Sequence, residues 1–141
     1  MEIFIKNLIE DKKNATLIMA ISLSKDEKLT NFLKNKDELL LNYKNISDEL
    51  KENTKFKNVW IQIIDIYGNS IYRSWTDKKT ENLSFRKDIK ETLINQKPSS
   101  SISVGAFDLT IKGRAPVYEK TKIIGFIEVI THFDSILEKL E

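Results

Sequence analysis

The chain has 141 residues, of which 40% are hydrophobic and 31% charged, with only 4 Gly and 2 Pro. This length fits one domain, and the composition is typical of an ordered globular chain, which excludes a disordered or collagen-like protein. The 23 basic and 21 acidic residues leave a net charge of +2, too balanced for a nucleic-acid-binding surface, and the absence of Cys excludes thiol catalysis, disulfides and thiolate zinc sites.

Residues 1–53 are predicted to be helical. Apolar residues recur at helical spacing from Ile3 to Leu23, which predicts one long helix. Ser24 and Glu27 have the spacing of a capping box, so we expect the helix to break there and restart. A further apolar series in residues 39–53 predicts another helix, so the first third of the chain is helical.

The periodicity changes at residue 58. Branched and aromatic residues in Val59–Asp65 and Ser70–Trp75, on either side of a tight-turn signal, predict a β-hairpin. A short helix is expected at Phe85–Asn95, because Phe85, Ile89 and Leu93 share one helical face. Ser99–Ser101 is expected to be a loop.

Three more strands complete a predicted sheet within residues 58–131, and residues 133–140 can form a closing helix. The order of helices, two strands, a helix, three strands and a helix favours an α+β fold with a five-stranded antiparallel sheet. The three strands are expected at Ile102–Val104, Phe107–Val117 and Ile123–Thr131.

A series of short motifs carries a resemblance over nearly the whole chain. Together they resemble the Cache sensor domains of bacterial chemoreceptors, sensor kinases and cyclic-di-GMP enzymes. Asp108 and Lys112 depart from the family pattern, which tends to have Gly and Arg at these positions. The motifs are Trp60-Ile61-Gln62-Ile63-Ile64-Asp65-Ile66-Tyr67-Gly68, Tyr72-Arg73-Ser74-Trp75, Leu83-Ser84-Phe85-Arg86-Lys87-Asp88, Val104-Gly105, Leu109-Thr110-Ile111-Lys112, Ala115-Pro116-Val117 and Ile124-Gly125-Phe126-Ile127-Glu128-Val129.

The resemblance implies a single Cache module at residues 1–141, with a long N-terminal helix packed on a PAS-like sheet. It also implies a small-molecule pocket between the sheet and the loop-helix segment after the hairpin, and a periplasmic or other extracytoplasmic location. The resemblance further implies transmembrane helices at both ends of the module in a longer receptor. This chain itself has no run near the roughly 20 apolar residues that a spanning helix needs. It also lacks the regions of a signal peptide, so we expect a fragment of that receptor.

Two pairs of residues are candidates for binding a charged ligand. Arg73 and Trp75 leave the same face of one strand, and a guanidinium beside an indole suits a ligand carboxylate. Arg86 and Asp88 lie at the start of the short helix, where Arg86 can bind an anion and Asp88 an amine. Tyr72 is included as a pocket wall, although its parity is opposite to that of Trp75. The alternatives are a surface Arg stacked on Trp, and helix capping with an ion pair.

Polar residues on one face of other strands are further candidates. Trp60 and Gln62 share a strand face, as do Lys112 and Arg114, so both faces are polar enough to line a cavity. The alternative is a solvated face, which we prefer for Arg114. Glu128 interrupts an apolar strand, and a buried carboxylate must be paired. It either contacts a ligand amine or forms a structural pair with a basic residue on an adjacent strand.

The leading hypothesis is a sensor domain, not an enzyme, that binds a small anionic or zwitterionic metabolite of the organic acid or amino acid class. No metal or cofactor is expected, because the chain has 1 His, no Cys and no nucleotide-binding or nucleophile motif. One alternative is a ligandless interaction module that dimerises through the N-terminal helix. Another is an enzyme, which would need paired carboxylates of perturbed pKa in a cleft.

Overall fold

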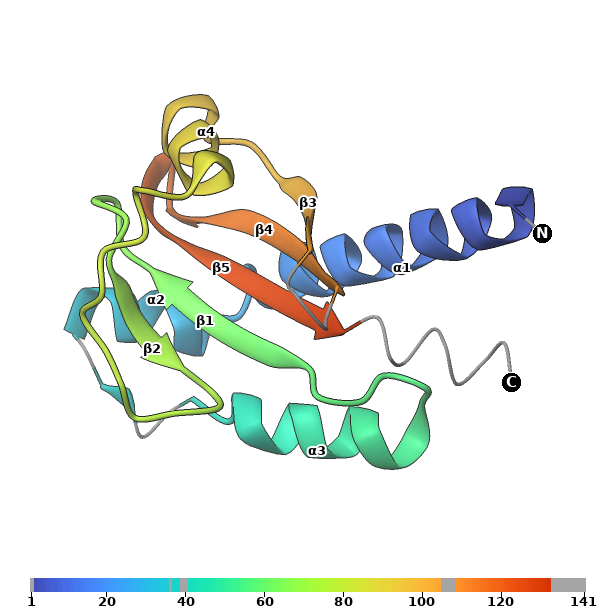
Figure 1. The fold of residues 1–141 in the computed structure, drawn as a ribbon. Coiled ribbons are helices and arrows are strands. Elements are labelled where there is room, and N and C mark those ends of the chain that lie inside the picture. The colour runs from blue at the N-terminus through green and yellow to red at the C-terminus, as the bar shows by residue number, and fades with distance from the viewer. Residues whose placement is uncertain (1, 36, 39–40, 105–108, 133–141) are drawn as a thin grey trace.

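The computed structural model describes residues 2–35, 37–38, 41–104 and 109–132, which form helices packed on one antiparallel sheet (Figure 1). The predicted α+β fold is confirmed. In chain order the elements are α1 (Glu2–Leu23), α2 (Glu27–Asn35), α3 (Tyr43–Asn53), β1 (Trp60–Ile64), β2 (Ser70–Arg73), α4 (Lys87–Asn95), β3 (Ser99–Val104), β4 (Leu109–Glu119) and β5 (Lys122–His132).

The sheet has the strand order β2-β1-β5-β4-β3, and every neighbouring pair is antiparallel. The last strand of the chain therefore lies in the middle, between β1 and β4. Helices α1, α2 and α3 lie on one side of the sheet, and α4 lies over the other side (Figure 1). None of the helices in the described residues is long and apolar enough to span a membrane.

The main core lies between the sheet and helices α1, α2 and α3. Alternate residues of the central strands point into it, as the period of two in a strand requires. Full burial of one such side chain stabilises the fold by about 1.5–3 kcal/mol. The buried members are Ala20, Leu29, Phe32, Leu33, Tyr43, Val59, Ile61, Ile63, Ala115, Val117, Ile127 and Val129.

Helix α1 crosses β4 in direct backbone contact. A Cβ atom on Gly113 would lie 2.8 Å from both the Thr16 carbonyl oxygen and the Leu17 Cα atom. The Oγ1 atoms of Thr16 and Thr131 are 2.9 Å apart and share a hydrogen bond across the same contact. The absence of a side chain at Gly113 is therefore what lets α1 lie flat on the sheet.

A smaller apolar cluster lies on the opposite side of the sheet, beneath α4. Ile64 and Phe126 of the sheet pack there against Leu83 and Ile89, all of them buried. This cluster positions α4 over one end of the sheet. The polar residues of the same sheet face continue from it towards β3.

Two local predictions were wrong. Ser99–Ser101, expected as a loop, is the first half of β3, because it pairs with β4 from Ser99↔Arg114 onwards. The predicted Ser24 cap is also not used. Ser24 Oγ donates to the Ile21 carbonyl, whereas the Asp26 carboxylate accepts from the Lys28 backbone amide at the start of α2.

Other predicted boundaries move by a few residues or lie outside the described residues. The helix expected at residues 39–53 begins at Tyr43, and residues 39–40 are outside the described ranges. The helix expected from Phe85 begins at Lys87. The closing helix at 133–140 lies outside the described residues, and so do Phe107 and Asp108.

Candidate functional site

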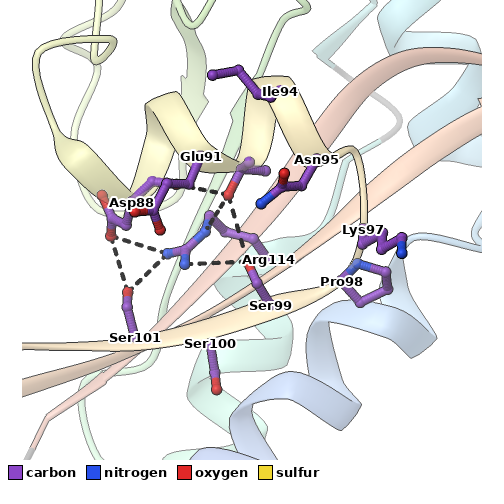
Figure 2. A pocket seen from close by; sticks show the side chains of 11 residues that line it. Asp88, Glu91, Ile94, Asn95, Lys97, Pro98, Ser99, Ser100, Ser101 and Arg114 are labelled. Atoms are coloured by element: carbon purple, nitrogen blue, oxygen red, sulfur yellow. Dashed lines mark hydrogen bonds and ion pairs between the residues drawn. The ribbon is translucent and has the colours of Figure 1, made fainter.

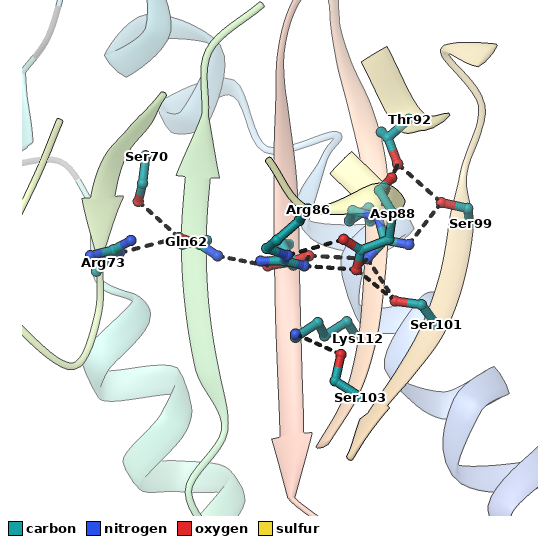
Figure 3. Close-up of polar contacts among 12 residues, drawn as sticks. Gln62, Ser70, Arg73, Arg86, Asp88, Thr92, Ser99, Ser101, Ser103 and Lys112 are labelled. Atoms are coloured by element: carbon teal, nitrogen blue, oxygen red, sulfur yellow. Dashed lines mark hydrogen bonds and ion pairs between the residues drawn. The ribbon is translucent and has the colours of Figure 1, made fainter. Parts of the chain in front are cut away.

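A polar network lies between the sheet and α4 (Figure 3). Arg114 of β4 is at its centre, because it donates hydrogen bonds to residues of α4, β3 and β5. Its side chain is only 2% exposed. Its Nη1 atom donates to both Asp88 Oδ2, at 3.1 Å, and Glu128 Oε2, at 3.0 Å. Nε donates to Thr92 Oγ1, and the guanidinium also donates to the hydroxyls of Ser99 and Ser101. A buried guanidinium carries its charge into the protein interior, and these hydrogen bonds and ion pairs offset the cost of removing it from water.

Glu128 of β5 lies beside Arg114 and has both oxygens occupied. Arg86 donates to it through both Nη atoms, at 3.2 Å to Oε1 and 2.8 Å to Oε2. Gln62 of β1 donates to Oε1 at 2.6 Å. The pairing predicted for Glu128 with a basic residue of an adjacent strand is confirmed, since Arg114 is its register partner on β4.

Asp88 brings α4 into the same network. Arg86, the residue before the helix, contacts both of its oxygens, at 3.0 Å from Nε and 2.8 Å from Nη2. Ser101 Oγ donates to Asp88 Oδ2 at 2.9 Å. Residues from the loop before α4, from α4 itself and from β3, β4 and β5 therefore meet at one point.

The arginines stabilise both carboxylates in their charged form. Burial alone raises the pKa of Glu128, but Arg86 and Arg114 outweigh it and hold this pKa below its ordinary value. The same balance of burial against hydrogen bonds and charge from Arg86 holds the pKa of Asp88 well below its usual range. These acids are therefore ion-pair members and poor proton acceptors.

We expect acid to destabilise the fold through these two groups. Their folded-state pKa values are depressed, so their stabilisation is complete above unfolded pKa values of about 4 and is lost as the pH falls through the folded pKa values. Urea midpoints measured between about pH 5 and pH 2 should fall steeply. Asp88→Asn should flatten this part of the profile and Glu91→Gln should not. Equal profiles for the two variants would contradict the assignment.

Lys112 adds a positive charge at the edge of the network. Its Nζ donates to Ser103 Oγ at 2.9 Å, and among the described residues it forms no ion pair. Burial and the nearby Arg86 guanidinium lower the pKa of Lys112. The charges of the two arginines and the two carboxylates cancel, so Lys112 leaves the cluster with a net positive charge.

Two clefts open on either side of this network, between α4 and β3. The larger, of about 610 Å³, extends along α4 to Pro98 and is shown in Figure 2. The smaller, of about 450 Å³, is lined by Arg86 and Lys112 among others. Asp88 and Ser101 line both clefts.

The predicted site residues lie in the polar network, in a stacked pair of tryptophans, or, for Tyr72, in the main core. Arg86, Asp88, Gln62, Lys112 and Glu128 lie together beneath or beside α4. Arg73 joins them from β2, because its Nε donates to Gln62 Oε1 at 3.3 Å while its Nη2 pairs with Glu81 at 3.1 Å.

Among the aromatic candidates, all of which the structure describes, only Trp75 is shown in contact with a network residue, since the Arg73 guanidinium lies 5.7 Å from the centre of its ring. Trp60 and Trp75 stack on each other at 4.8 Å, with His132 edge-on to Trp60. Tyr72 points to the opposite face of the sheet, where it packs against Phe32 and Tyr43 in the main core.

Sequence reasoning missed the residue with the most contacts. We interpreted Arg114 as solvent-facing, and this was wrong, because α4 covers its strand face. Ser99 and Ser101 were also missed. A signal was present: Ser99, Ser101 and Ser103 alternate with a period of two, as residues on one face of a strand do.

The fold agrees with the comparison with known families. The chain matches, over residues 2–141, the dCache_3 family, described as the double sensory domain of two-component sensor kinase. The chain therefore belongs to this family of sensory domains, and the Cache resemblance with its role in signal transduction is confirmed. The single-module organisation stays a prediction.

Solved structures show the same fold at low sequence identity. The chain is similar to the sensor domain of the Vibrio cholerae histidine kinase DctB, with 19% identity, a TM-score of 0.70 and coverage of 94% of this chain and 54% of that one. The Escherichia coli DcuS sensor domain gives 15% identity, a TM-score of 0.71 and coverage of 94% and 97%. The ligand-binding domain of the Campylobacter jejuni chemoreceptor Tlp3, in complex with 4-methylisoleucine, gives 16% identity and a TM-score of 0.59. This match covers 92% of this chain and 55% of that one.

The chain spans about half the length of the DctB and Tlp3 chains and nearly all of the DcuS sensor-domain chain. The chain is also similar to the extracellular domain of the putative histidine kinase vpHK1S-Z8, with 14% identity and a TM-score of 0.70, in agreement with the extracytoplasmic location that the resemblance implies. None of the curated proteins compared with the chain matches it.

Proposed function

We propose that this chain is the extracytoplasmic ligand-sensing module of a bacterial transmembrane receptor, and that it binds a small anionic or zwitterionic metabolite beside α4. The observation that carries this proposal is the excess positive charge at Lys112, which lines the smaller of two clefts that reach a buried ion-pair network. Membership of a sensory family supports the receptor role.

The chemistry of the smaller cleft favours an anion. Arg86, Lys87 and Lys112 line it, with Asp88 and Glu91 as the acids. Asp88 is already paired with arginine, so its charge is compensated. A ligand carboxylate near Lys112 would find an ammonium group and the Ser103 hydroxyl, and charge-assisted hydrogen bonds of this kind are the strong ones.

Binding rather than catalysis is the activity that these groups support. The carboxylates are held ionised by arginine, so neither has the raised pKa of a general acid or base. Within the described ranges no cluster of three His, Asp or Glu residues could hold a metal ion. We therefore propose that the chain is not an enzyme.

A thermal-shift screen of amino acids and small carboxylates tests this proposal. A ligand at 100 times its Kd adds about 2.7 kcal/mol to stability by mass action, and each kcal/mol raises the Tm of a domain near this size by about 2–4 °C. Lys112→Met should weaken binding of a hit about tenfold or more, which corresponds to losing about 1.4 kcal/mol. Lys97→Met is the matched control, because Lys97 is exposed and lines the larger cleft.

The candidate ligand role of Arg73 is tested with the same hit. Arg73→Ala should also weaken binding if the ligand reaches the β2 side of the network. A hit whose affinity is the same in wild type, Lys112→Met and Arg73→Ala would place its site elsewhere.

A ligandless interaction module is the second candidate, and one feature favours it. Helix α1 exposes Ile3, Phe4 and Ile18, at 76%, 52% and 62% of their surface, and its N-terminal turns extend past the sheet (Figure 1). An absence of any hit at millimolar ligand, together with a concentration-dependent dimer in sedimentation that Phe4→Asp abolishes, would favour this alternative.

A further inference from the structure

We propose that Asp88 occupies the position of the ligand carboxylate, so that a small carboxylate binds by displacing Asp88 from the two arginines. This inference rests on the proposed function and deepens it, because it names the ligand group and the contacts that this group takes over. It also assigns Asp88 a role opposite to that of an amine-binding residue.

The contacts of Asp88 form a complete carboxylate-binding set. Arg86 makes a two-point contact at 3.0 and 2.8 Å, which is the geometry that guanidinium offers to any carboxylate. Arg114 adds a hydrogen bond at 3.1 Å, and Ser101 adds one at 2.9 Å. These donors would serve a carboxylate from solution equally well.

Of the two acids in the network, Asp88 is the one that can be exchanged. The Glu128 side chain is 0% exposed and is held by Gln62 from the neighbouring strand, whereas Asp88 is 18% exposed. Asp88 also lines both clefts, and Figure 2 shows it beside Ser101 at the edge of the larger one. A carboxylate entering from either side therefore meets the guanidinium donors where Asp88 now lies.

Displacement of Asp88 would change how α4 is held. The helix is attached to β4 through two contacts of Arg114, with Asp88 Oδ2 and with Thr92 Oγ1. A ligand that took the first contact would loosen the N-terminal turn of α4, which would then be held by the packing of Ile89 and by the contact of Arg86 with Glu128. Exchange of one carboxylate for another would in this way convert binding into movement of a helix, with the ligand's differential affinity setting the extent.

Chemical rescue of Asp88→Ala by acetate tests the exchange. The variant removes one of the two carboxylates that Arg86 and Arg114 share, so acetate should raise its Tm in a saturable manner, by about 3–6 °C at ten times the Kd. The Tm of wild type and of Glu91→Ala should rise less with acetate. In both proteins the Asp88 side chain competes with acetate at a high effective concentration. Glu91 lines the same two clefts and forms no ion pair with either arginine, so it is the matched control.

Chloride and acetamide at equal concentration separate carboxylate binding from ionic strength and from shape. Rescue by acetate alone supports the proposal. An equal response of wild type and Asp88→Ala, or no response of the variant, would overturn it. Asp88→Asn keeps the shape of the side chain and gives a second folded variant if alanine destabilises the domain too far.

Affinity for a carboxylate hit from the ligand screen separates this inference from the proposed function. Exchange predicts that Asp88→Asn binds the hit more tightly than wild type, by about tenfold or more, since the competing charge is gone. Weaker binding in Asp88→Asn, with Lys112→Met also weakened, would overturn the exchange and leave the proposed function standing. Acetate rescue without any metabolite hit would support the exchange and would count against the proposed metabolite binding.

Discussion

Replacing Arg114 with methionine is expected to lower the free energy of unfolding by about 3–5 kcal/mol, the usual cost of breaking a buried ion pair from one side. The substitution removes the hydrogen bonds to Asp88 and Glu128 and leaves the second of these, a fully buried carboxylate, to Arg86 and Gln62. Urea denaturation followed by circular dichroism measures the loss.

Arg73→Met is the control for this experiment, because it removes a guanidinium whose carboxylate partner is much more accessible. Glu81 is 40% exposed, so water can solvate it once Arg73 is gone. We expect the control to lose clearly less stability than Arg114→Met. Adding Glu128→Gln to Arg114→Met should recover part of the loss, because the charges then balance, and a double-mutant cycle gives the coupling free energy. Equal losses for Arg114→Met and Arg73→Met would contradict the central role of Arg114.

The sheet and its two faces were predictable because strand parity is a local property. Gln62 was expected on a polar strand face, and Glu128 was expected as a paired carboxylate within an apolar strand. The structure pairs these two residues across β1 and β5. Parity tells which side chains share a face, but it does not tell what covers that face. The environment of Arg114 depends on α4, whose Asp88 lies 26 positions earlier in the chain. The burial of Arg114 was therefore outside the reach of local patterns.

The strand at Ser99–Ser101 was missed for a similar reason. Serine has little intrinsic preference for strands, and strand formation here follows from pairing with β4. The hydroxyls of Ser99 and Ser101 then face Arg114, while Ser100 points away from it (Figure 2). The sequence indicated a sensor pocket near this segment through family resemblance, and the ion-pair network that fills the space required the three-dimensional structure.

Helices α1 and α4 contact opposite faces of β4 and are held there in different ways, which bears on how a signal would travel. Helix α4 is attached above Arg114 by polar contacts that a solute can replace. Helix α1 is held on the other face by backbone contact at Gly113, which no solute can replace. We therefore expect α1 and the sheet to act as one rigid unit against which α4 changes position.

Replacing Gly113 with alanine is expected to destabilise the domain by about 1–3 kcal/mol, the usual cost of overpacking, and valine should cost more. The added Cβ would lie 2.8–2.9 Å from backbone atoms of Thr16 and Leu17, which cannot rotate away as a side chain can. Hydrogen exchange should show faster exchange of α1 amides, because the helix must lift from β4. Ser100→Ala is the control, since Ser100 pairs directly with Gly113 and the change adds no atoms; we expect its effect to stay within about 0.5 kcal/mol. An unchanged urea midpoint in Gly113→Ala would mean that α1 is not held by this contact. It would contradict the expectation that α1 and the sheet act as one rigid unit.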